Sequence, residues 1–367
     1  MTNLVLYRKY RPKIFAEVMG QEHTIRILTN ALLFNKVSHA YLFAGPRGTG
    51  KTSIARLLAK AVNCEKLPTA NCQSLTNYEP CNQCFSCLEI NQGTAIDLIE
   101  IDAASNRGID EMRELREGIK FVPMKSKYKV FIIDECHQLT KEAANALLKI
   151  LEEPPSHAIF ILATTEPQKM ITTIISRCQR FDFRRLKAKE INETLEKILK
   201  QEKIDFETEA LHLIAQVSCG SLRDAETLLD QAISFSGAKG LIKKEIVEKI
   251  LGITGKEVIF EFLNYVFQKQ TKEAIEFLEE IIYKGIDLQE FTKTLIVYLR
   301  EFLLLKINLD FDGSLTLSEE EKEKINGLIK NLSEKELKDL LEKIMAAEAK
   351  MKYSSMPQLL LELAIIE

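Results

Sequence analysis

An eight-residue stretch of this chain has the residue types and the spacing that hold a chain of phosphates. Residues 45–52 read Gly-Pro-Arg-Gly-Thr-Gly-Lys-Thr and match the pattern G-x-x-x-x-G-K-[ST] throughout. Glycines let backbone N–H groups approach phosphate oxygens, and the N-terminus of a following helix favours negative charge. Lys51 can reach the β- and γ-phosphates, and the Thr52 hydroxyl can hold Mg²⁺. We therefore expect nucleotide contacts from Gly45, Pro46, Arg47, Gly48, Thr49, Gly50, Lys51, Thr52 and Ser53.

A pair of acids follows a second apolar stretch. Residues 130–133 form a continuous apolar run, as expected of a strand buried on both faces, and Asp134 and Glu135 come next. An aspartate at the end of a strand can hold the Mg²⁺ that bridges phosphates, and a neighbouring glutamate can polarise an attacking water. Solvated acids that simply end a strand are the alternative. Because both motifs follow predicted strands, the pair favours hydrolysis over binding alone, with Lys51 and Glu135 as catalytic candidates.

Five of the eight cysteines fall in one short stretch, which is typical of a metal site. Two residues separate Cys81 from Cys84 and Cys84 from Cys87, and in a cytosolic chain this spacing favours metal over disulfides. Structural Zn²⁺ takes four ligands. Spacing alone does not decide whether Cys64 or Cys72 is the fourth, and unligated thiols or a redox group are the alternatives to zinc.

Hydrophobic patterning predicts the elements that position these groups. Apolar runs alternate with helical patterns up to about residue 183, which predicts an α/β fold with a parallel sheet covered by helices. Ligand sites in such sheets lie at the carboxyl ends of strands, where both motifs fall. The strands are expected at 40–45, 97–101, 129–134, 158–164 and 179–183. Helices are expected at 21–35, 51–62, 109–120 and 140–153, then at 188–202, 207–218 and 222–235, and throughout 243–367.

Composition limits the class of protein. The chain has 367 residues, of which 46% are hydrophobic and 28% charged, and this length suggests two or three domains. No apolar run approaches the roughly 18 residues of a membrane span, and the N-terminal residues lack a signal-peptide pattern, so a cytoplasmic protein is expected. The net charge of −3 excludes a whole-surface attraction to nucleic acid and leaves only local contacts.

Together the motifs resemble the tau/gamma family of bacterial DNA polymerase III clamp-loader subunits, within the AAA+ ATPase superfamily. Residues 10–21 contain Tyr-Arg-Pro-x-x-Phe-x-x-Val-x-Gly-Gln, which is similar to the first signature of that family. Asp-Glu-Cys-His at 134–137, Ser-Arg-Cys at 176–178 and Gly-Ser-Leu-Arg-Asp at 220–224 resemble its acidic box, its serine-arginine-cysteine motif and its second sensor. The cysteine cluster is similar to the zinc module of the family. The resemblance covers essentially the whole chain.

The resemblance implies a domain organisation and a function. It implies an AAA+ nucleotide-binding domain over residues 1–183 with a zinc module at about 63–92, a helical lid over 184–240, and an all-α collar for oligomerisation over 241–367. It further implies an ATP-hydrolysing motor that loads a sliding clamp onto primed DNA during replication, with ATP, Mg²⁺ and Zn²⁺ as cofactors. The implied partners are the other subunits of a hetero-pentamer, the clamp, and the DNA backbone. No polymerase active site is implied.

Several residue roles come from the resemblance alone. Arg177 would be an arginine finger toward the ATP of an adjacent subunit, and a surface ion pair is the alternative. Arg223 would sense phosphates in the same subunit, or be an exposed residue beside a helix cap at Ser221. Thr165 would be the first sensor, or merely end a strand. The adenine would be bordered by Tyr10, Arg11 and Val18.

The resemblance also assigns zinc ligands and DNA contacts. The four-cysteine module of the family implies Cys64, Cys81, Cys84 and Cys87 as ligands, with Cys72 able to replace one of them. Clamp loaders follow the duplex backbone with positions that correspond to Ser105 and Arg107, at the start of a helix. Simple capping of that helix is the alternative.

Two other functions are compatible with parts of the pattern. A non-hydrolysing structural loader subunit usually has a degraded phosphate loop, whereas Lys51, Thr52, Asp134 and Glu135 are all present. An AAA+ motor of another DNA process, such as a branch-migration helicase, would not be expected to carry the zinc module and the third helical domain.

Overall fold

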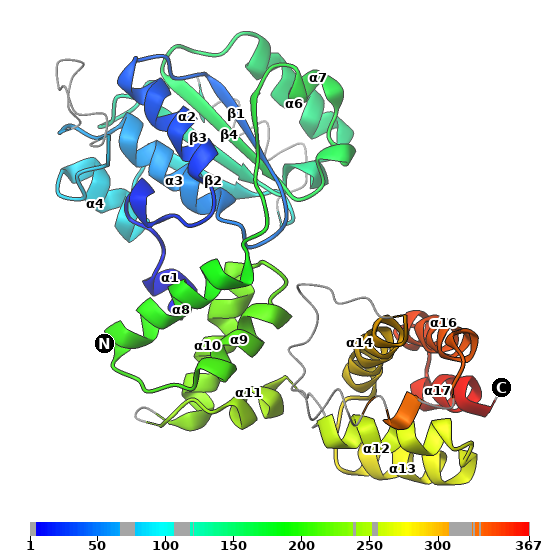
Figure 1. Cartoon of the computed structure of the whole chain (residues 1–367). Coiled ribbons are helices and arrows are strands. Elements are labelled where there is room, and N and C mark those ends of the chain that lie inside the picture. Colours follow the sequence, from blue (N-terminus) through cyan, green and yellow to red (C-terminus); the bar gives the residue numbers. More distant parts are fainter. Residues whose placement is uncertain are drawn as a thin grey trace. The chain divides into compact units, whose positions relative to one another are not determined.

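The computed structural model describes residues 5–66, 78–105, 118–119, 121–237, 240–251, 256–307, 325, 327–329 and 332–366. The chain divides into two compact units, Met1–Ile242 and Lys243–Glu367 (Figure 1). Each unit has a hydrophobic core of its own.

The first unit is built on five parallel strands. They run in the order β2-β3-β4-β1-β5, and both the five strands and their parallel direction confirm the prediction. Because β4 pairs with both β1 and β3, the two motif-bearing strands flank it and all three end at the same edge of the sheet. The strands are β1 (Ala40–Ala44), β2 (Leu98–Asp102), β3 (Lys129–Asp134), β4 (Ala158–Thr164) and β5 (Gln179–Asp182).

Helices cover both faces of the sheet, so the unit has three layers (Figure 1). Side chains of β4 alternate between two cores: Phe160 packs in the cluster with α6, and Ile161 packs in the cluster with α3. Burial on both faces explains why the strands are continuous apolar runs in the sequence. The helices are α2 (Glu22–Leu33), α3 (Lys51–Val62), α4 (Phe85–Gln92), α6 (Lys141–Glu152) and α7 (Thr172–Ile175), with short 3₁₀ turns at Phe15–Glu17, Cys136–Gln138 and Pro167–Lys169.

The predicted helices at 21–35, 51–62 and 140–153 are confirmed to within two residues at each end. The prediction at 109–120 lies almost wholly outside the described residues, which include only 118–119 of that stretch. Helix α4 was not predicted. Its apolar residues, Phe85, Cys87, Leu88 and Ile90, are spread around the helix, so no single apolar face marks it as helical.

Three helices follow the sheet within the first unit. They confirm the predictions at 188–202, 207–218 and 222–235, and the short N-terminal helix α1 (Leu6–Lys9) packs against the third. The Ser221 hydroxyl accepts a hydrogen bond from the Asp224 N–H at 3.3 Å, which confirms the predicted cap. The division at residues 183/184 stays a prediction. The helices are α8 (Ala188–Glu202), α9 (Thr208–Val217) and α10 (Leu222–Ser236).

The described residues of the second unit are helical, as predicted. Phe262, Phe291 and Phe302 lie at the centre of its core and are fully buried. In the described ranges, no helix combines the length and the apolar character that crossing a bilayer requires. The helices are α11 (Lys244–Ile250), α12 (Lys256–Phe267), α13 (Thr271–Tyr283), α14 (Leu288–Lys306), α16 (Glu334–Met351) and α17 (Pro357–Ile366).

Truncation of a buried side chain on the central strand β4 should strongly destabilise the first unit. Phe160 is fully buried and stacks on Phe131 with ring centroids 5.2 Å apart. Phe160→Ala should therefore lower the free energy of unfolding by about 3–5 kcal/mol, measured by urea denaturation followed by circular dichroism. The matched control is Phe34→Ala, because that side chain is 64% exposed. Equal losses in the two variants would contradict the described core.

Candidate functional site

The phosphate-binding loop joins the end of β1 to the start of α3. The Lys51 ammonium lies inside this loop and donates hydrogen bonds to the carbonyl oxygens of Gly45 and Pro46, both at 2.8 Å. Burial lowers the pKa of Lys51, while the nearby carboxylates of Glu135 and Asp134 act in the opposite direction. A poorly solvated cation with loop carbonyls as its neighbours is well placed to exchange them for an anionic ligand.

The same loop contacts the start of α10. The Leu222 N–H donates to the Gly48 carbonyl at 3.1 Å. Gly48 has φ +74°, and a Cβ at this position would lie 1.9 Å from the Ser221 Oγ. Only glycine therefore fits both the backbone conformation and the contact with the first residues of α10. Gly48 thus serves tertiary packing, in addition to the phosphate contact that the sequence predicts.

The acid pair faces the loop from β3. The Thr52 hydroxyl donates to the Asp134 Oδ2 at 2.7 Å, so the two groups expected to hold Mg²⁺ are adjacent. Glu135, whose backbone is in the left-handed region with φ +47°, contacts Thr165 after β4 rather than Thr52. Its Oε2 accepts from the Thr165 hydroxyl at 2.8 Å and from the Thr165 N–H at 3.3 Å. The predicted base and first sensor are therefore in direct contact.

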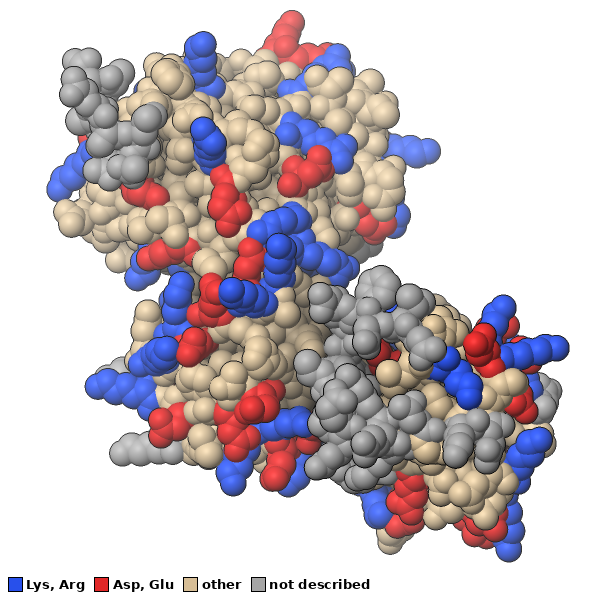
Figure 2. Space-filling model, viewed as in Figure 1, with Lys and Arg blue, Asp and Glu red and all other residues tan. Residues whose placement is uncertain are grey.

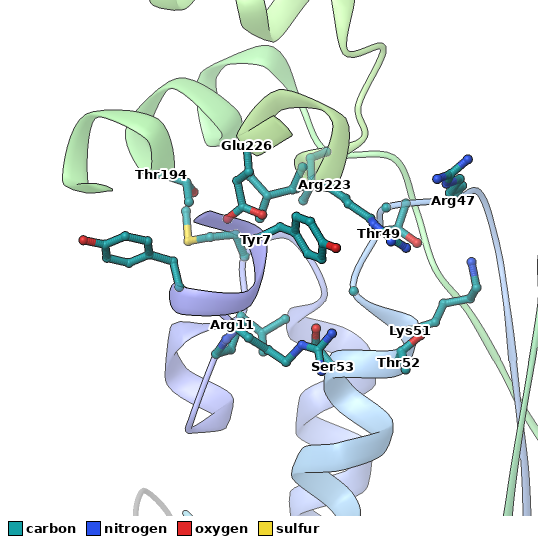
Figure 3. A pocket seen from close by; sticks show the side chains of 18 of the residues that line it. Tyr7, Arg11, Arg47, Thr49, Lys51, Thr52, Ser53, Thr194, Arg223 and Glu226 are labelled. Carbon is teal, nitrogen blue, oxygen red and sulfur yellow. The ribbon is translucent and has the colours of Figure 1, made fainter. Parts of the chain in front are cut away.

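One cavity brings most of the predicted residues together (Figure 3). It is lined by residues from the phosphate loop, the acid pair, the N-terminal segment and α10. The structure thus joins segments that are far apart in the sequence. The predicted residues that line the cavity are Tyr10, Arg11, Val18, Arg47, Gly48, Thr49, Gly50, Lys51, Thr52, Ser53, Asp134, Glu135 and Arg223.

Other predicted residues do not line the cavity. Gly45 and Pro46 contact Lys51, and Thr165 contacts Glu135. Arg177 lies elsewhere: its guanidinium is 2.8 Å from the Glu152 carboxylate and donates to the Thr173 carbonyl at 2.9 Å. The ion pair that the sequence left open is therefore the arrangement seen in this chain by itself, and the finger role stays a prediction.

The end of the cavity beyond the loop is formed by the N-terminal segment and the helices that follow the sheet. The Tyr10 hydroxyl donates to Glu202 on α8 at 2.6 Å. The Arg223 guanidinium lies over the ring of Tyr7, 4.9 Å from its centroid, and the two side chains extend toward one another in Figure 3. Burial, followed by the charge of Arg56, lowers the pKa of Arg11. Sequence reasoning missed Tyr7, although it lies only three residues before the first signature.

Glu226 is a second residue that sequence reasoning missed. It lines the cavity from α10, is 7% exposed, and accepts no hydrogen bond from the described part of the chain. Burial raises its pKa to about 7, although the charge of Arg11 opposes the shift. A signal existed: Glu226 lies three positions after Arg223 and therefore on the same face of the helix.

The four favoured cysteines form one cluster. The sulfur atoms of Cys64, Cys81, Cys84 and Cys87 all lie within 4.8 Å of one another. Tetrahedral Zn–S bonds of about 2.3 Å require S···S distances of about 3.8 Å, so a small adjustment would fit the ion. N–H groups at the start of α4 support the sulfurs, and the Cys84 N–H lies 3.2 Å from the Cys81 Sγ. Cys72 lies outside the described residues.

A buried lysine of α3 connects the region of this cluster to the N-terminal segment. Lys60 is on α3, is 2% exposed, and donates to the Lys13 carbonyl at 2.7 Å and to the side-chain oxygens of Asn82 and Asn91 at 2.6 and 2.9 Å. Asn82 follows Cys81 directly. Sequence reasoning missed Lys60, because a lysine within an amphipathic helix is usually solvated.

The predicted DNA contacts are described only in part. Ser105 lies in an exposed turn after β2, where its hydroxyl donates to Asp102 at 3.1 Å, and Arg107 lies outside the described residues. Figure 2 shows lysines and arginines interspersed with acids on the visible face.

Three protein families match successive parts of the chain. Residues 20–187 match "DNA polymerase III, delta subunit", and residues 190–238 match "DNA polymerase III clamp loader subunit, ATPase lid domain". Residues 242–367 match "DNA polymerase III subunits gamma and tau domain III".

Individual relatives agree with these families. DNA polymerase III subunit tau of Bacillus subtilis is 45% identical over 374 residues, which cover 100% of this chain and 63% of the relative. Subunit gamma of Buchnera aphidicola is 40% identical, over 83% of this chain and 79% of the relative. For Escherichia coli subunit tau the identity is 43%, over 78% of this chain and 43% of the relative. The chain therefore spans less than two thirds of the length of these tau relatives.

A solved structure that is similar to this chain has a lower sequence identity than these relatives. The Thermotoga maritima RuvB Holliday junction branch migration motor has a TM-score of 0.49 and 18% identity, over 85% of this chain and 96% of that chain. A likeness at this level carries no argument about function.

The buried carboxyl of Glu226 should make stability depend on pH. Its pKa is raised from 4.5 in the unfolded chain to about 7 in the folded one, because burial favours the neutral carboxyl. The protonated carboxyl therefore contributes fully to the free energy of unfolding below pH 4.5, and this contribution is lost as the pH rises through 7. Glu226→Gln cannot ionise. At pH 8.5 its free energy of unfolding should exceed that of the wild type by up to about 3 kcal/mol, and at pH 4.5 the two should be similar.

Urea denaturation at the two pH values measures this difference. The control is Glu193→Gln, the same substitution at an exposed position of α8. A difference between Glu226→Gln and the wild type that does not change with pH would contradict the buried, ionisable state of Glu226.

Proposed function

Because the chain belongs to the family of DNA polymerase III gamma and tau clamp-loader subunits, we propose that it is an ATP-hydrolysing motor that loads a sliding clamp onto primed DNA. One observation carries the hydrolytic part of the proposal. Lys51, Thr52, Asp134 and Glu135 line a single cavity, and the Thr52 and Asp134 oxygens are 2.7 Å apart.

The phosphates of ATP would lie on the loop. Lys51 would exchange its two loop carbonyls for phosphate oxygens, and the backbone N–H groups at the start of α3 would complete the cradle. Thr52 and Asp134 supply the hard oxygen ligands that Mg²⁺ prefers, and the bound ion would neutralise charge on the phosphates. Arg47, Thr49 and Ser53 would line the same space.

Glu135 would act as the general base. It would accept a proton from the water whose oxygen bonds to the γ-phosphorus, while the bond to the bridging oxygen breaks and ADP leaves. Its hydrogen bond from the Thr165 hydroxyl, at 2.8 Å, supports a positioning role for Thr165. Arg223, at the start of α10, would contact the phosphates from the lid and make lid position depend on the nucleotide.

The remaining roles concern partners. Arg177 would leave Glu152 in the assembled loader and serve the ATP of an adjacent subunit. The pentamer would assemble through residues 241–367, and the nucleotide-binding domain and the lid would occupy residues 1–183 and 184–240. Ser105 and Arg107 would contact the backbone of primed DNA. Tyr10, Arg11 and Val18 would border the adenine.

A structural zinc site is the second part of the proposal. Four thiols within 4.8 Å of one another, two of them buried, are the donor set that Zn²⁺ prefers. The positive charge of buried Lys60 would offset part of the negative charge of a four-thiolate site. Such a site would hold the end of α3 to the start of α4.

A non-hydrolysing structural subunit is the main alternative. It is disfavoured because it would need neither Glu135 nor the contact between Glu135 and Thr165. A motor of another DNA process is disfavoured by the match of residues 242–367 to domain III of the gamma and tau subunits.

Two substitutions separate ATP binding from hydrolysis. Lys51→Ala should abolish ATP binding measured by calorimetry, because the Lys51 ammonium is the cation that lies on the loop carbonyls of Gly45 and Pro46. Glu135→Gln should retain binding but slow ATP turnover by the assembled loader by about 10²-fold or more, because it removes the base and preserves the shape. Lys36→Ala, at an exposed position, is the control for the first variant. Turnover by Glu135→Gln within a few-fold of wild type would rule out Glu135 as the base.

Metal analysis tests the cysteine cluster. The purified chain should carry about one Zn²⁺, and Cys81→Ser should lose it and unfold at a lower temperature, because metal affinity contributes to folding. Cys219→Ser, at an exposed position outside the cluster, should change neither quantity. Cys72→Ser should also keep the metal. Zinc loss in Cys72→Ser together with retention in Cys64→Ser would reverse the assignment of the fourth ligand.

A further inference from the structure

The cavity has two chemically different ends. Lys51 and Thr52 lie at the end formed by the phosphate loop, and Glu226 reaches the cavity from α10 (Figure 3). Arg223 and Glu226 extend from the same helix into the space above Tyr7 and Arg11. A nucleotide with its phosphates on the loop would therefore direct its ribose and base toward Glu226.

The carboxylate of Glu226 accepts no hydrogen bond from the residues that the structure describes. Its side chain is 7% exposed, and no described residue donates to it. Arg11 influences it through charge alone. A largely buried carboxylate that meets no donor in the described part of the chain destabilises the folded state, so its place at a ligand cavity points to a donor that the ligand supplies.

The surroundings of Glu226 suit a flat ring with a donor at its edge. The cavity walls include the apolar side chains of Val18, Met19, Leu186 and Leu222. The other carboxylate at this end, Glu17, is exposed and already accepts a hydrogen bond from the Lys13 N–H at 2.6 Å. Apolar walls with a few convergent polar groups are typical of small-molecule sites, and at this end Glu226 is the acceptor to which no described residue donates.

We propose that Glu226 accepts a hydrogen bond from the exocyclic amino group of adenine and selects 6-amino purines over 6-oxo purines. The inference rests on the proposed function, since it assumes a nucleotide in this cavity. A 6-oxo purine would place a carbonyl oxygen against the carboxylate, so that two acceptors would face one another. A site that must leave its acceptor unpaired when the wrong base binds discriminates between bases more strongly than a site that relies on the fit of apolar surfaces.

Calorimetric titration of the full chain with Mg-ATP and Mg-ITP tests the proposal. Inosine triphosphate differs from ATP at the base position in question. The titrations are made at pH 8, where Glu226, with a pKa of about 7, is largely ionised. The wild type should bind ATP at least about tenfold more tightly than ITP, as expected for a hydrogen bond to a charged group. Glu226→Gln can pair with either base and should lower this ratio about tenfold.

Control measurements distinguish the failure of this inference from the failure of the proposed function. Glu193→Gln, on the exposed face of α8, should keep the wild-type ratio. The triphosphate of purine riboside, which lacks the amino group, should bind the wild type about tenfold more weakly than ATP, a test that needs no variant. Wild-type binding that is equal for ATP, ITP and this analogue would overturn the role of Glu226. So would a Glu226→Gln variant that weakens all nucleotides equally, since the residue would then contact the ribose or support the lid. A folded wild type that binds no ATP would instead overturn the proposed function.

Discussion

The contact between Gly48 and the start of α10 determines the geometry of the whole site. The Leu222 N–H donates to the Gly48 carbonyl at 3.1 Å, and the Ser221 hydroxyl occupies the space that a Cβ on Gly48 would need. The first turn of α10 therefore lies on the phosphate loop. Arg223 and Glu226 reach the cavity because they follow this contact by one and four positions on α10. A larger side chain at residue 48 would displace the helix, and with it both residues.

Helix α3 connects the two proposed ligand sites. It carries Lys51 and Thr52 at its N-terminus and Lys60 near its C-terminus, and Cys64 follows it. Its 12 residues span about 18 Å, so a rigid, largely buried element runs from the loop to the cysteine cluster. The hydrogen bonds of Lys60 to Asn82 and Asn91 strengthen this connection. A metal in the cluster would thus stabilise the helix that presents the phosphate-binding residues.

Strand order explains how the acid pair meets its partners. Because β4 lies between β1 and β3, the residues after all three strands converge on one edge of the sheet. Thr165 follows β4 and reaches Glu135, while Asp134 reaches Thr52 at the start of α3. Burial of Lys51 beside these acids makes the local charge balance sensitive to a bound anion.

Local patterns in the sequence determined the elements and most of the chemistry. The G-x-x-x-x-G-K-T loop, the apolar run before Asp134 and the alternation of strands and helices depend on neighbours in the chain. The five strands and the six helices α2, α3, α6, α8, α9 and α10 were predicted to within two residues at each end. Helix α4 was missed because no apolar periodicity marks it.

Contacts between distant segments were decided by the tertiary structure. Spacing could not choose between Cys64 and Cys72. Packing of α3 against α4 brings the Cys64 sulfur to the other three, while Cys72 lies outside the described residues and the choice of the fourth ligand stays a prediction. Only the fold shows Arg177 paired with Glu152, and only the fold buries Lys60 and Glu226. The physical reason is that periodicity specifies which face of a helix is apolar, whereas the partner of a polar side chain depends on which elements pack together.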